Sequence, residues 1–149
     1  MTRVLVLQGP NLNLLGTREP ELYGTRTLHD LQVDIQHWAV ALGLEVVHFQ
    51  SNHEGALIDR IQEHDFDAAI VNAGGLTHTS VALRDALLAV NRPFVEVHLT
   101  DPNTREAFRK VNFLADVAID RIYGQGPEGY RLALGVIARR FGTQPPGGR

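Results

Sequence analysis

Short apolar runs alternate along the chain with longer segments in which apolar residues recur every three or four positions. The short runs predict strands at residues 3–8, 45–50, 68–72, 94–99 and 116–122. The periodic segments predict helices at about residues 27–42, 55–64, 80–91, 102–111 and 129–141. Strands that alternate with helices are typical of a parallel sheet covered on both faces. We therefore expect a doubly wound α/β fold with a five-stranded parallel sheet of order 2-1-3-4-5.

Capping residues and helix breakers support the ends of these elements. Thr27 precedes the first helix and Gly43 follows it, as N-cap and stop residues commonly do. Asp101 followed by Pro102 is typical of a helix start. Residues 9–26 contain glycines and prolines without any period, so we expect a long loop of the kind that often closes over a ligand.

The composition fits one globular domain. The chain has 149 residues, of which 44% are hydrophobic and 21% are charged, close to the averages of folded proteins. We expect residues 1–142 to form a single catalytic domain and residues 143–149, a stretch rich in Pro and Gly, to form a disordered tail. The net charge of −3 gives no basic surface for nucleic acid.

Several kinds of chemistry are excluded by what the sequence lacks. It has no cysteine, so disulfides, thiolate nucleophiles and cysteine-based zinc sites cannot form. The histidines show no short metal-ligand spacing, and the one lysine, Lys110, stands in a polar stretch unsuited to an imine. The sequence shows no signal peptide and no apolar run of about 18 residues. We therefore expect a cytoplasmic protein that binds no metal and contacts no membrane.

Polar side chains suited to acid–base chemistry follow or end three of the predicted strands. Parallel strands end together, and open α/β sheets bind ligands at the carboxyl ends of their strands, so these side chains are expected in one crevice. The candidates are Asn11, Arg18, Tyr23, Asn72, His78, Glu96 and His98. A phenol, two imidazoles, a guanidinium and amides together predict acid–base chemistry on a small anionic substrate.

The loop after the first strand carries Arg18 and Tyr23 between Gly16 and Gly24. A neighbouring guanidinium would lower the pKa of the tyrosine phenol and make it a usable base. Glycines at both ends of this segment are suited to the hinges of a lid. The alternative is that both side chains are ordinary loop residues and that Asn11 is only a turn residue.

The segment after the third strand places Asn72 at the strand end and His78 just before a helix that Thr79 or Ser80 can cap. Its two glycines allow the backbone to approach a ligand closely. The N–H groups at the helix start suit anionic oxygens. The alternative is a capped turn with a histidine that serves only the structure.

Glu96 and His98 are two residues apart in the fourth strand, so they project from the same face. A carboxylate in that position would orient the imidazole or hold its proton. The alternative is an edge strand whose polar face meets solvent. Pro93 and the apolar neighbours favour a central strand and hence the functional interpretation.

Arg105 and Arg109 are four residues apart on the predicted helix 102–111, where they would share a face suited to clamping a carboxylate. The alternative is that both arginines lie on a charged face exposed to solvent. For Asp85 on the third helix, a plain solvent-exposed position is likewise the alternative to a functional role.

Residues 124–129, GQGPEG, match the dinucleotide fingerprint G-x-G-x-x-G. No second βαβ unit follows that segment, so we interpret it as a tight turn.

Taken in order, these segments resemble the motifs of the type II 3-dehydroquinate dehydratases over about residues 3–140. The motifs are Gly9-Pro10-Asn11-Leu12, Arg18-Glu19-Pro20, Tyr23-Gly24, Gln50-Ser51-Asn52, Asn72 through Ser80, Glu96-Val97-His98 and Arg105-Glu106-x-Phe108-Arg109. The resemblance implies a flavodoxin-like fold and the dehydration of 3-dehydroquinate to 3-dehydroshikimate, on the shikimate route to chorismate, without cofactor or metal. It also implies a homododecamer assembled as a tetramer of trimers.

The resemblance implies a role for each candidate. Tyr23 would be the base that removes the C2 proton, Arg18 would stabilise its phenolate, and Asn11 would hold a water against the enolate oxygen. His98, supported by Glu96, would protonate the departing C1 hydroxyl. The other substrate contacts would come from Asn72, His78, the backbone N–H groups of Leu99 and Thr100, Arg105, Arg109 and, toward a neighbouring subunit's site, Asp85.

Four positions depart from the family pattern. Thr100-Asp101 stands where Ser-Asn is frequent. Thr100 keeps the N–H and hydroxyl groups, whereas Asp101 would repel an anionic substrate unless it faces away as a helix cap. Asn112 and His53 each replace a frequent serine, and we expect little effect from either.

Two other functions would suit the same fold class. A flavodoxin-like module that binds a mononucleotide or flavin without catalysis would need a phosphate loop rich in Ser, Thr and Gly after the first strand. Residues 9–16 offer Pro, Asn and Leu there instead. A phospho-accepting signalling domain would need an aspartate at the end of the third strand, where Asn72 stands.

Overall fold

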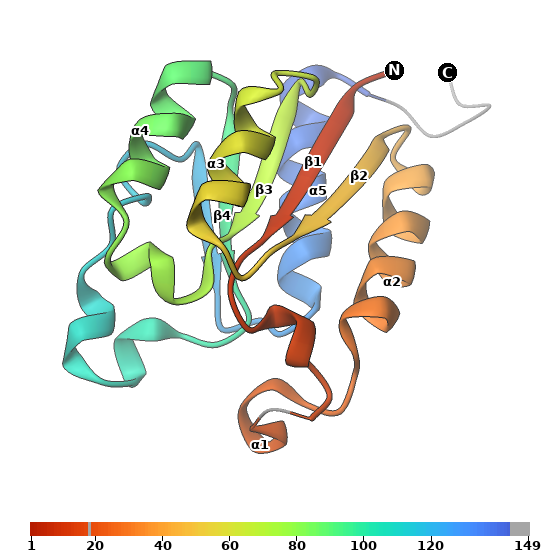
Figure 1. The fold of residues 1–149 in the computed structure, drawn as a ribbon. Helices are drawn as coiled ribbons and strands as arrows, with labels where there is room; N and C mark the ends of the chain where they lie inside the picture. The colour runs from red at the N-terminus through yellow and green to blue at the C-terminus, as the bar shows by residue number, and fades with distance from the viewer. Residues whose placement is uncertain (18, 144–149) are drawn as a thin grey trace.

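A computed structural model describes residues 1–17 and 19–143, apart from the side chains of Leu22 and Tyr23. It contains a five-stranded parallel sheet of order β2-β1-β3-β4-β5 (Figure 1). The strands are β1 (Arg3–Gln8), β2 (Glu45–Gln50), β3 (Ala68–Asn72), β4 (Phe94–His98) and β5 (Asp120–Tyr123). The predicted strand order is confirmed, and β1, β2 and β3 have the predicted bounds.

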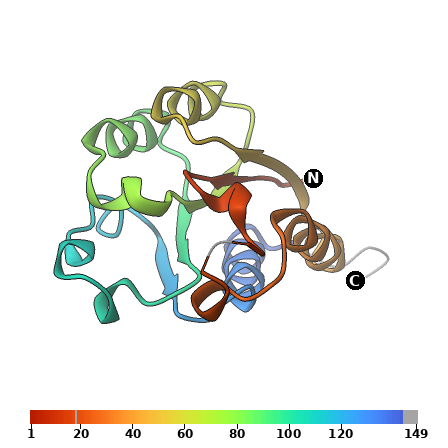
Figure 2. The ribbon, with the colours of Figure 1, turned by 60° about the horizontal axis from the view of Figure 1, so that its bottom comes forward.

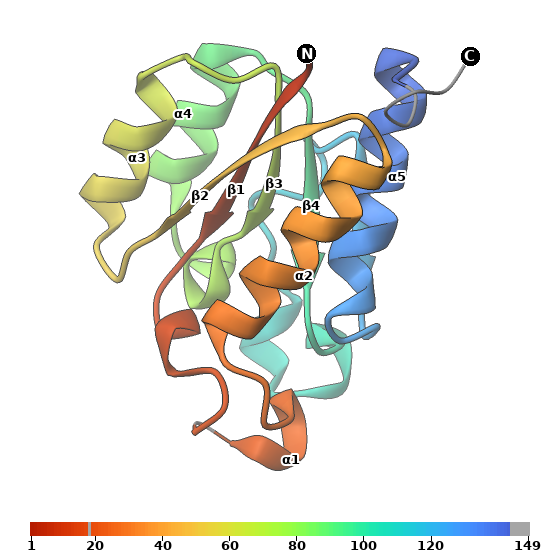
Figure 3. The same ribbon diagram turned by 90° about the vertical axis from the view of Figure 1, so that its right-hand side faces the viewer.

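Helices cover both faces of the sheet (Figure 3). One face carries α2 (Leu28–Ala41) and α5 (Glu128–Phe141), and the other carries α3 (Glu54–Gln62) and α4 (Val81–Val90). The alternation of β1 explains this arrangement, since Val4 and Val6 pack in the core under α2 and α5 while Leu5 and Leu7 pack under α3 and α4. β1 is therefore buried on both faces as an interior strand of the sheet, between β2 and β3.

The predicted helix caps are present. The Thr27 hydroxyl accepts a hydrogen bond from the Asp30 N–H, and the Asp30 carboxylate accepts one from the Thr27 N–H, which completes a capping box. Ser80, one of the two predicted caps of α4, accepts from the Leu83 N–H at 2.9 Å. Gly43, just beyond α2, has a φ of 74°, a conformation that favours glycine.

The prediction of one helix over residues 102–111 is wrong. Two short 3₁₀ helices stand there, η3 (Pro102–Thr104) and η4 (Ala107–Lys110), and Arg105 between them has extended backbone angles. The Thr104 hydroxyl donates to the Asp101 carbonyl, and the Asp101 carboxylate accepts from the Asn103 N–H. These local hydrogen bonds compete with a continuous α-helix and end it after one turn.

The fourth and fifth strands are shorter than predicted. The fifth begins at Asp120 rather than at residue 116, because the N–H groups of Val117 and Ala118 both donate to the Leu114 carbonyl and form a turn. The Ile119 N–H reaches the Phe94 carbonyl as the chain enters the sheet. The fourth strand ends at His98, one residue before the predicted end.

The long segment after β1 is more structured than the predicted loop. It contains η1 (Leu12–Leu14), whose Leu12 is buried together with Leu15, and a short helix α1 (Pro20–Tyr23) that Pro20 begins. Figure 2 shows this segment at the same end of the sheet as the turns after β3 and β4. Its position at the carboxyl ends of the strands makes it part of one edge of a cavity.

The last described residue, Thr143, contacts the C-terminal end of α2. The Thr143 hydroxyl donates to the Leu42 carbonyl at 2.8 Å, whereas residues 144–149 of the predicted tail lie outside the described residues. Among the helices of the described part of the chain, none has the length and apolar character needed to cross a bilayer.

Candidate active site

A polar cavity lies at the carboxyl ends of β1, β3 and β4, where the sequence predicts a crevice. The residues that line it are Pro10, Asn11, Leu12, Asn72, Gly74, Gly75, His78, His98, Leu99, Thr100, Pro102, Arg105 and Arg109. Three segments far apart in the sequence therefore meet around one space. This is the position in which open α/β sheets bind ligands.

Two glycines allow the turns after β1 and β3 to pack backbone against backbone. A Cβ atom at Gly9 would lie 2.5 Å from the Ala73 carbonyl oxygen, so no other residue fits there without a shift of the backbone. Gly74 has a φ of +58°, and a Cβ atom there would lie 3.0 Å from the Pro10 carbonyl oxygen. This close approach brings Asn11 to the same cavity as the turn that follows β3.

The side chain of Asn72, at the end of β3, is held in place by a hydrogen bond to the hydroxyl of a buried tyrosine. Its Nδ2 donates to the Tyr130 hydroxyl at 2.9 Å, and its Oδ1 accepts from the Gly74 N–H at 3.2 Å. The Tyr130 hydroxyl donates in turn to Gln8 Oε1 at 2.7 Å. Burial raises the pKa of Tyr130 to about 12, so its hydroxyl stays protonated. The Asn72 amide is thus fixed, with one N–H and one lone pair left for a ligand.

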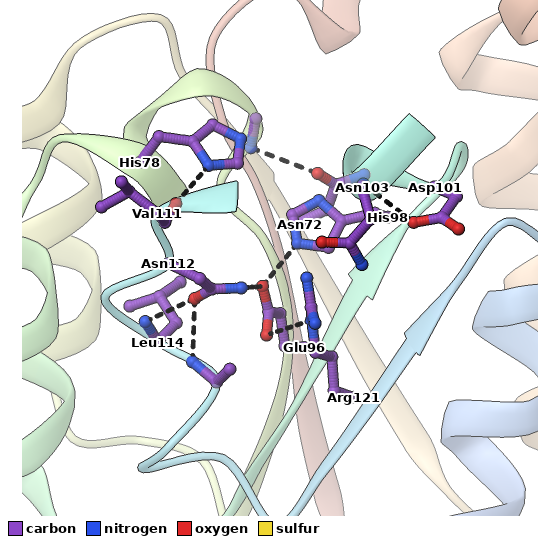
Figure 4. Close-up of polar contacts among 12 residues, drawn as sticks. Asn72, His78, Glu96, His98, Asp101, Asn103, Val111, Asn112, Leu114 and Arg121 are labelled. Carbon is purple, nitrogen blue, oxygen red and sulfur yellow. Dashed lines mark hydrogen bonds and ion pairs between the residues drawn. The ribbon is translucent and has the colours of Figure 1, made fainter. Parts of the chain in front are cut away.

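His78 is fixed by a backbone carbonyl in the segment after η4. Its Nδ1 lies 2.6 Å from the Val111 carbonyl oxygen, so Nδ1 carries the hydrogen (Figure 4). Burial lowers the pKa of His78, with smaller contributions in the same direction from His98 and Arg109, against the opposing hydrogen bond to Val111. A neutral His78 presents Nε2 as an acceptor for a ligand hydroxyl.

His98 forms a buried pair with Glu96, as their shared face on β4 predicts. The His98 Nε2 atom lies 2.5 Å from Glu96 Oε2, and Glu96 is fully buried (Figure 4). The rings of His78 and His98 stack with their centres 6.4 Å apart. β4 lies between β3 and β5, so the alternative of an edge strand is wrong. Glu96 lies behind His98 and does not itself line the cavity.

Two further side chains hold Glu96. Asn112 Nδ2 donates to Glu96 Oε2 at 2.6 Å, and Arg121 Nε on β5 lies 3.4 Å from Glu96 Oε1. The sequence analysis did not predict that Asn112 and Arg121 contact Glu96, or that Tyr130 accepts a hydrogen bond from Asn72. A lone asparagine in a turn, an arginine in a short strand and a tyrosine on an apolar helix face carry no local signal of a contact with another element.

Leu99 and Thr100 follow β4 and line the cavity beside His98. Asp101, the next residue, uses its carboxylate to accept the Asn103 N–H at 2.9 Å and is not part of the lining. It therefore caps η3 and faces away, so the repulsion that its charge would exert on an anion is reduced by distance and by solvent.

Arg105 and Arg109 both line the cavity, although they come from different turns and not from one helix face. Arg109 Nε donates to Glu106 Oε1 at 2.8 Å. Arg105 NH2 lies 3.7 Å from Glu19 Oε2, which links the wall of the cavity to the residue just before α1. Two guanidinium groups beside amides and imidazoles suit a small anion that also carries hydroxyl groups.

The structure does not test two of the predicted residues, because Arg18 and the side chain of Tyr23 lie outside the described residues. A third, Asp85, is exposed on α4 and does not line this cavity. In the described part of the chain, no group of three or more His, Cys, Asp or Glu side chains is arranged to hold a metal ion.

Known proteins are similar to this chain in sequence and in fold. Residues 2–138 match the family described as Dehydroquinase class II. A 3-dehydroquinate dehydratase of Sodalis glossinidius (strain morsitans) is 53% identical over 142 residues, which cover 94% of this chain and 95% of that protein. The crystal structure of the type II dehydroquinase of Propionibacterium acnes is 35% identical with a TM-score of 0.89, over 93% of this chain and 97% of that one. The type II dehydroquinase of Butyrivibrio crossotus DSM 2876 is 41% identical with a TM-score of 0.89, over 91% and 97% of the two chains.

Proposed function

Because this chain belongs to the class II dehydroquinase family, we propose that it is a hydro-lyase which converts 3-dehydroquinate to 3-dehydroshikimate on the shikimate pathway. The observation that carries the proposal is that His98, paired with the buried Glu96, lines a cavity that two arginines also line. The reaction removes a proton next to a ketone and a hydroxyl group from the adjacent carbon. It therefore needs a base, a stabilised enolate and an acid.

The base is Tyr23, with Arg18 beside it to keep the phenol close to its ionised form. Support comes from the neighbouring residue Glu19, which directly precedes α1 and lies 3.7 Å from Arg105 of the cavity wall. The backbone of α1 thus begins beside the cavity. A nearby guanidinium lowers the pKa of a phenol by favouring its charged form.

The enolate oxygen is stabilised by a water that Asn11 holds. The Asn11 N–H donates to Asn52 Oδ1 at 2.9 Å, and this hydrogen bond fixes the turn that carries the Asn11 side chain at the edge of the cavity. Donors fixed in advance stabilise the charge that develops as the C2 proton leaves.

His98 is the acid that protonates the departing C1 hydroxyl. Its Nε2 is taken up by Glu96, which leaves Nδ1 to deliver the proton. The imidazolium form must be present before the hydroxyl leaves, and the Glu96 carboxylate lies beside it at Nε2. Closure of the loop over the substrate would exclude water and strengthen these interactions.

The remaining residues bind the substrate. The backbone N–H groups of Leu99 and Thr100 hold its carboxylate, and Asn72, His78 and Arg109 bind its hydroxyl groups, with Arg105 near Tyr23. Asp85 is exposed on α4, as a residue that reaches the site of a neighbouring subunit must be. We propose a homododecamer, a tetramer of trimers, that works in the cytoplasm as one domain over residues 1–142.

Turnover of 3-dehydroquinate, followed by the absorbance of the enone product, tests the proposal. We expect Tyr23→Phe and His98→Ala each to lower kcat by about 10²- to 10⁴-fold while the fold is kept. Tyr123→Phe on β5 is the matched control and should retain activity. A Tyr23→Phe protein with normal turnover would rule out the proposed base.

Two further experiments test the alternatives to this mechanism. Flavin absorbance in the purified protein, without turnover, would favour a flavodoxin-like module that only binds a mononucleotide or flavin. Borohydride added with substrate should leave the enzyme active, whereas a covalent adduct on Lys110 would contradict a mechanism without an imine.

A further inference from the structure

The turn that covers Glu96 contains an asparagine whose amide is held from two directions (Figure 4). Asn112 Oδ1 accepts the backbone N–H groups of Leu114 at 2.7 Å and of Ala115 at 2.9 Å. Its Nδ2 donates to Glu96 Oε2 at 2.6 Å. The asparagine therefore joins the backbone of this turn to a fully buried carboxylate.

The orientation of the amide follows from its backbone partners. An N–H group only donates, so the Asn112 atom that faces Leu114 and Ala115 must be the oxygen, and the NH₂ group must face Glu96. Glu96 Oε2 then has to accept. The same oxygen lies 2.5 Å from His98 Nε2, so the hydrogen between them belongs to the imidazole.

We infer that Asn112 is a positioning residue which, through Glu96, fixes the tautomer of His98 with hydrogen on Nε2 and leaves Nδ1 to exchange a proton with the substrate. The inference rests on the proposed role of His98 as the acid. Asn112 does not line the cavity and acts only through Glu96.

The surroundings of the pair support this arrangement. Arg121 on β5 forms an ion pair with Glu96, with Nε 3.4 Å from Glu96 Oε1. Across the cavity, His98 faces the stacked ring of His78 and, beyond it, Arg109. Without a donor at position 112, Oε2 would be free to take a proton, and Nε2 would then become an acceptor. The hydrogen of a neutral His98 would then move to Nδ1.

Asn112→Asp separates this role from the structural role of the side chain. One carboxyl oxygen of the variant can still accept from Leu114 and Ala115, so the turn is kept. The other oxygen faces Glu96. When protonated it donates as the amide does, and when ionised it repels Glu96 and provides no donor. We expect kcat near that of the wild type at about pH 5.5 and a loss of about tenfold or more by about pH 8, with little change in KM.

Asn103→Asp is the matched control, because it adds the same charge at an exposed position in a nearby turn that does not line the cavity. It should follow the wild-type pH profile. Asn112→Leu, which removes both the acceptor and the donor, should lower kcat at every pH if it folds. Equal pH profiles of kcat for Asn112→Asp and the wild type would overturn the inference.

Nitrogen-15 NMR of the imidazole rings gives a second test that needs no turnover. The wild type should show His98 with hydrogen on Nε2, and Asn112→Asp should lose this signature at about pH 8 while Asn103→Asp keeps it. A wild type that shows the signature but no dehydratase activity would refute the proposed function and leave the positioning intact. A tautomer that is the same in Asn112→Asp and the wild type at pH 8 would refute the role of Asn112.

Discussion

The two sides of the cavity are held in different ways. On the side of β3 and β4, Asn72, His78 and Glu96 each make hydrogen bonds inside the chain to groups contributed by other elements. On the side of the segment after β1, buried Leu12 and Leu15 hold the first part, but the residues around α1 are mostly exposed. The described link from there to the cavity wall is an ion pair of 3.7 Å between Glu19 and Arg105.

This difference indicates a division of labour. The β3–β4 side holds its donors and acceptors in fixed orientations before a substrate arrives, as stabilisation of developing charge requires. The segment around α1 is joined to Arg105 through the half-exposed side chain of Glu19, whose ion pair costs little to rearrange. Changes on the first side should therefore affect both stability and chemistry, whereas changes on the second should affect mainly the function of the loop.

The largest effect on stability is expected for Glu96→Ala. The change leaves Arg121 without its buried anion and removes the acceptor for Asn112, so we expect a loss of about 3 kcal/mol in the free energy of unfolding. Urea denaturation followed by circular dichroism measures it. Glu96→Gln keeps the shape and should cost less. A stability equal to that of the wild type in Glu96→Ala would show that this side is not held through its buried carboxylate.

Tyr130→Phe should have the next largest effect. It removes the hydroxyl that accepts from Asn72 and donates to Gln8, both of which are buried, so we expect a loss of about 1–3 kcal/mol. Tyr123→Phe, on the partly exposed end of β5, is the control and should stay within about 0.5 kcal/mol of the wild type. In turnover assays, Tyr130→Phe should raise KM more than it lowers kcat. A change confined to kcat would mean that Asn72 does not bind the substrate.

The depressed pKa of His78 should make the stability of the β3–β4 side depend on pH. In the unfolded chain this histidine takes up a proton near its ordinary pKa of 6.5, whereas burial lowers that pKa in the folded state. Between the two values the unfolded state binds more protons, so stability should fall as the pH falls through 6.5 toward the lower folded pKa. Urea midpoints at several pH values measure this dependence.

His78→Gln should flatten that dependence without removing it, because burial also lowers the pKa of His48 in the folded state. The double variant with His48→Gln should be flatter still. A slope that neither change alters would mean that other groups control the acid sensitivity of the fold.

Much of the architecture can be predicted from the sequence because its signals are local. The apolar runs of β1, β2 and β3 and the caps of α2 and α4 each act within a few residues of themselves. The strand order follows from the alternation of strands with helices. The pairing within β4 could be predicted for the same reason, since period-2 spacing alone puts Glu96 and His98 on one face, although the strand ends one residue earlier than predicted.

Most of what could not be predicted depends on contacts between distant segments. The break after β4 into η3 and η4 is different, because there Asp101 and Thr104 form local hydrogen bonds with nearby backbone groups, which compete with a continuous helix. Asn112 was expected to have little effect, and only the fold brings it to Glu96. Tyr130 has the spacing of a core residue on α5, and its polar function depends on Gln8 and Asn72.

Glu19→Ala should have the smallest effect and gives the sharpest contrast between the two sides. The carboxylate of Glu19 is 41% exposed and lies 3.7 Å from Arg105, so its removal should change the free energy of unfolding by less than about 1 kcal/mol. If the ion pair holds α1 beside the cavity, kcat/KM should nevertheless fall measurably, and high salt should reduce the difference from the wild type because it screens the pair in both proteins.

Glu21→Ala, also exposed and in α1, is the control for the loss of one negative charge. It should leave kcat/KM and its dependence on salt unchanged. A loss of several kcal/mol in Glu19→Ala would contradict the division between the two sides, since an exposed pair would then hold as much of the fold as the buried Glu96. Equal kcat/KM in Glu19→Ala and the wild type at low salt would show instead that the segment around α1 reaches its working position without Arg105.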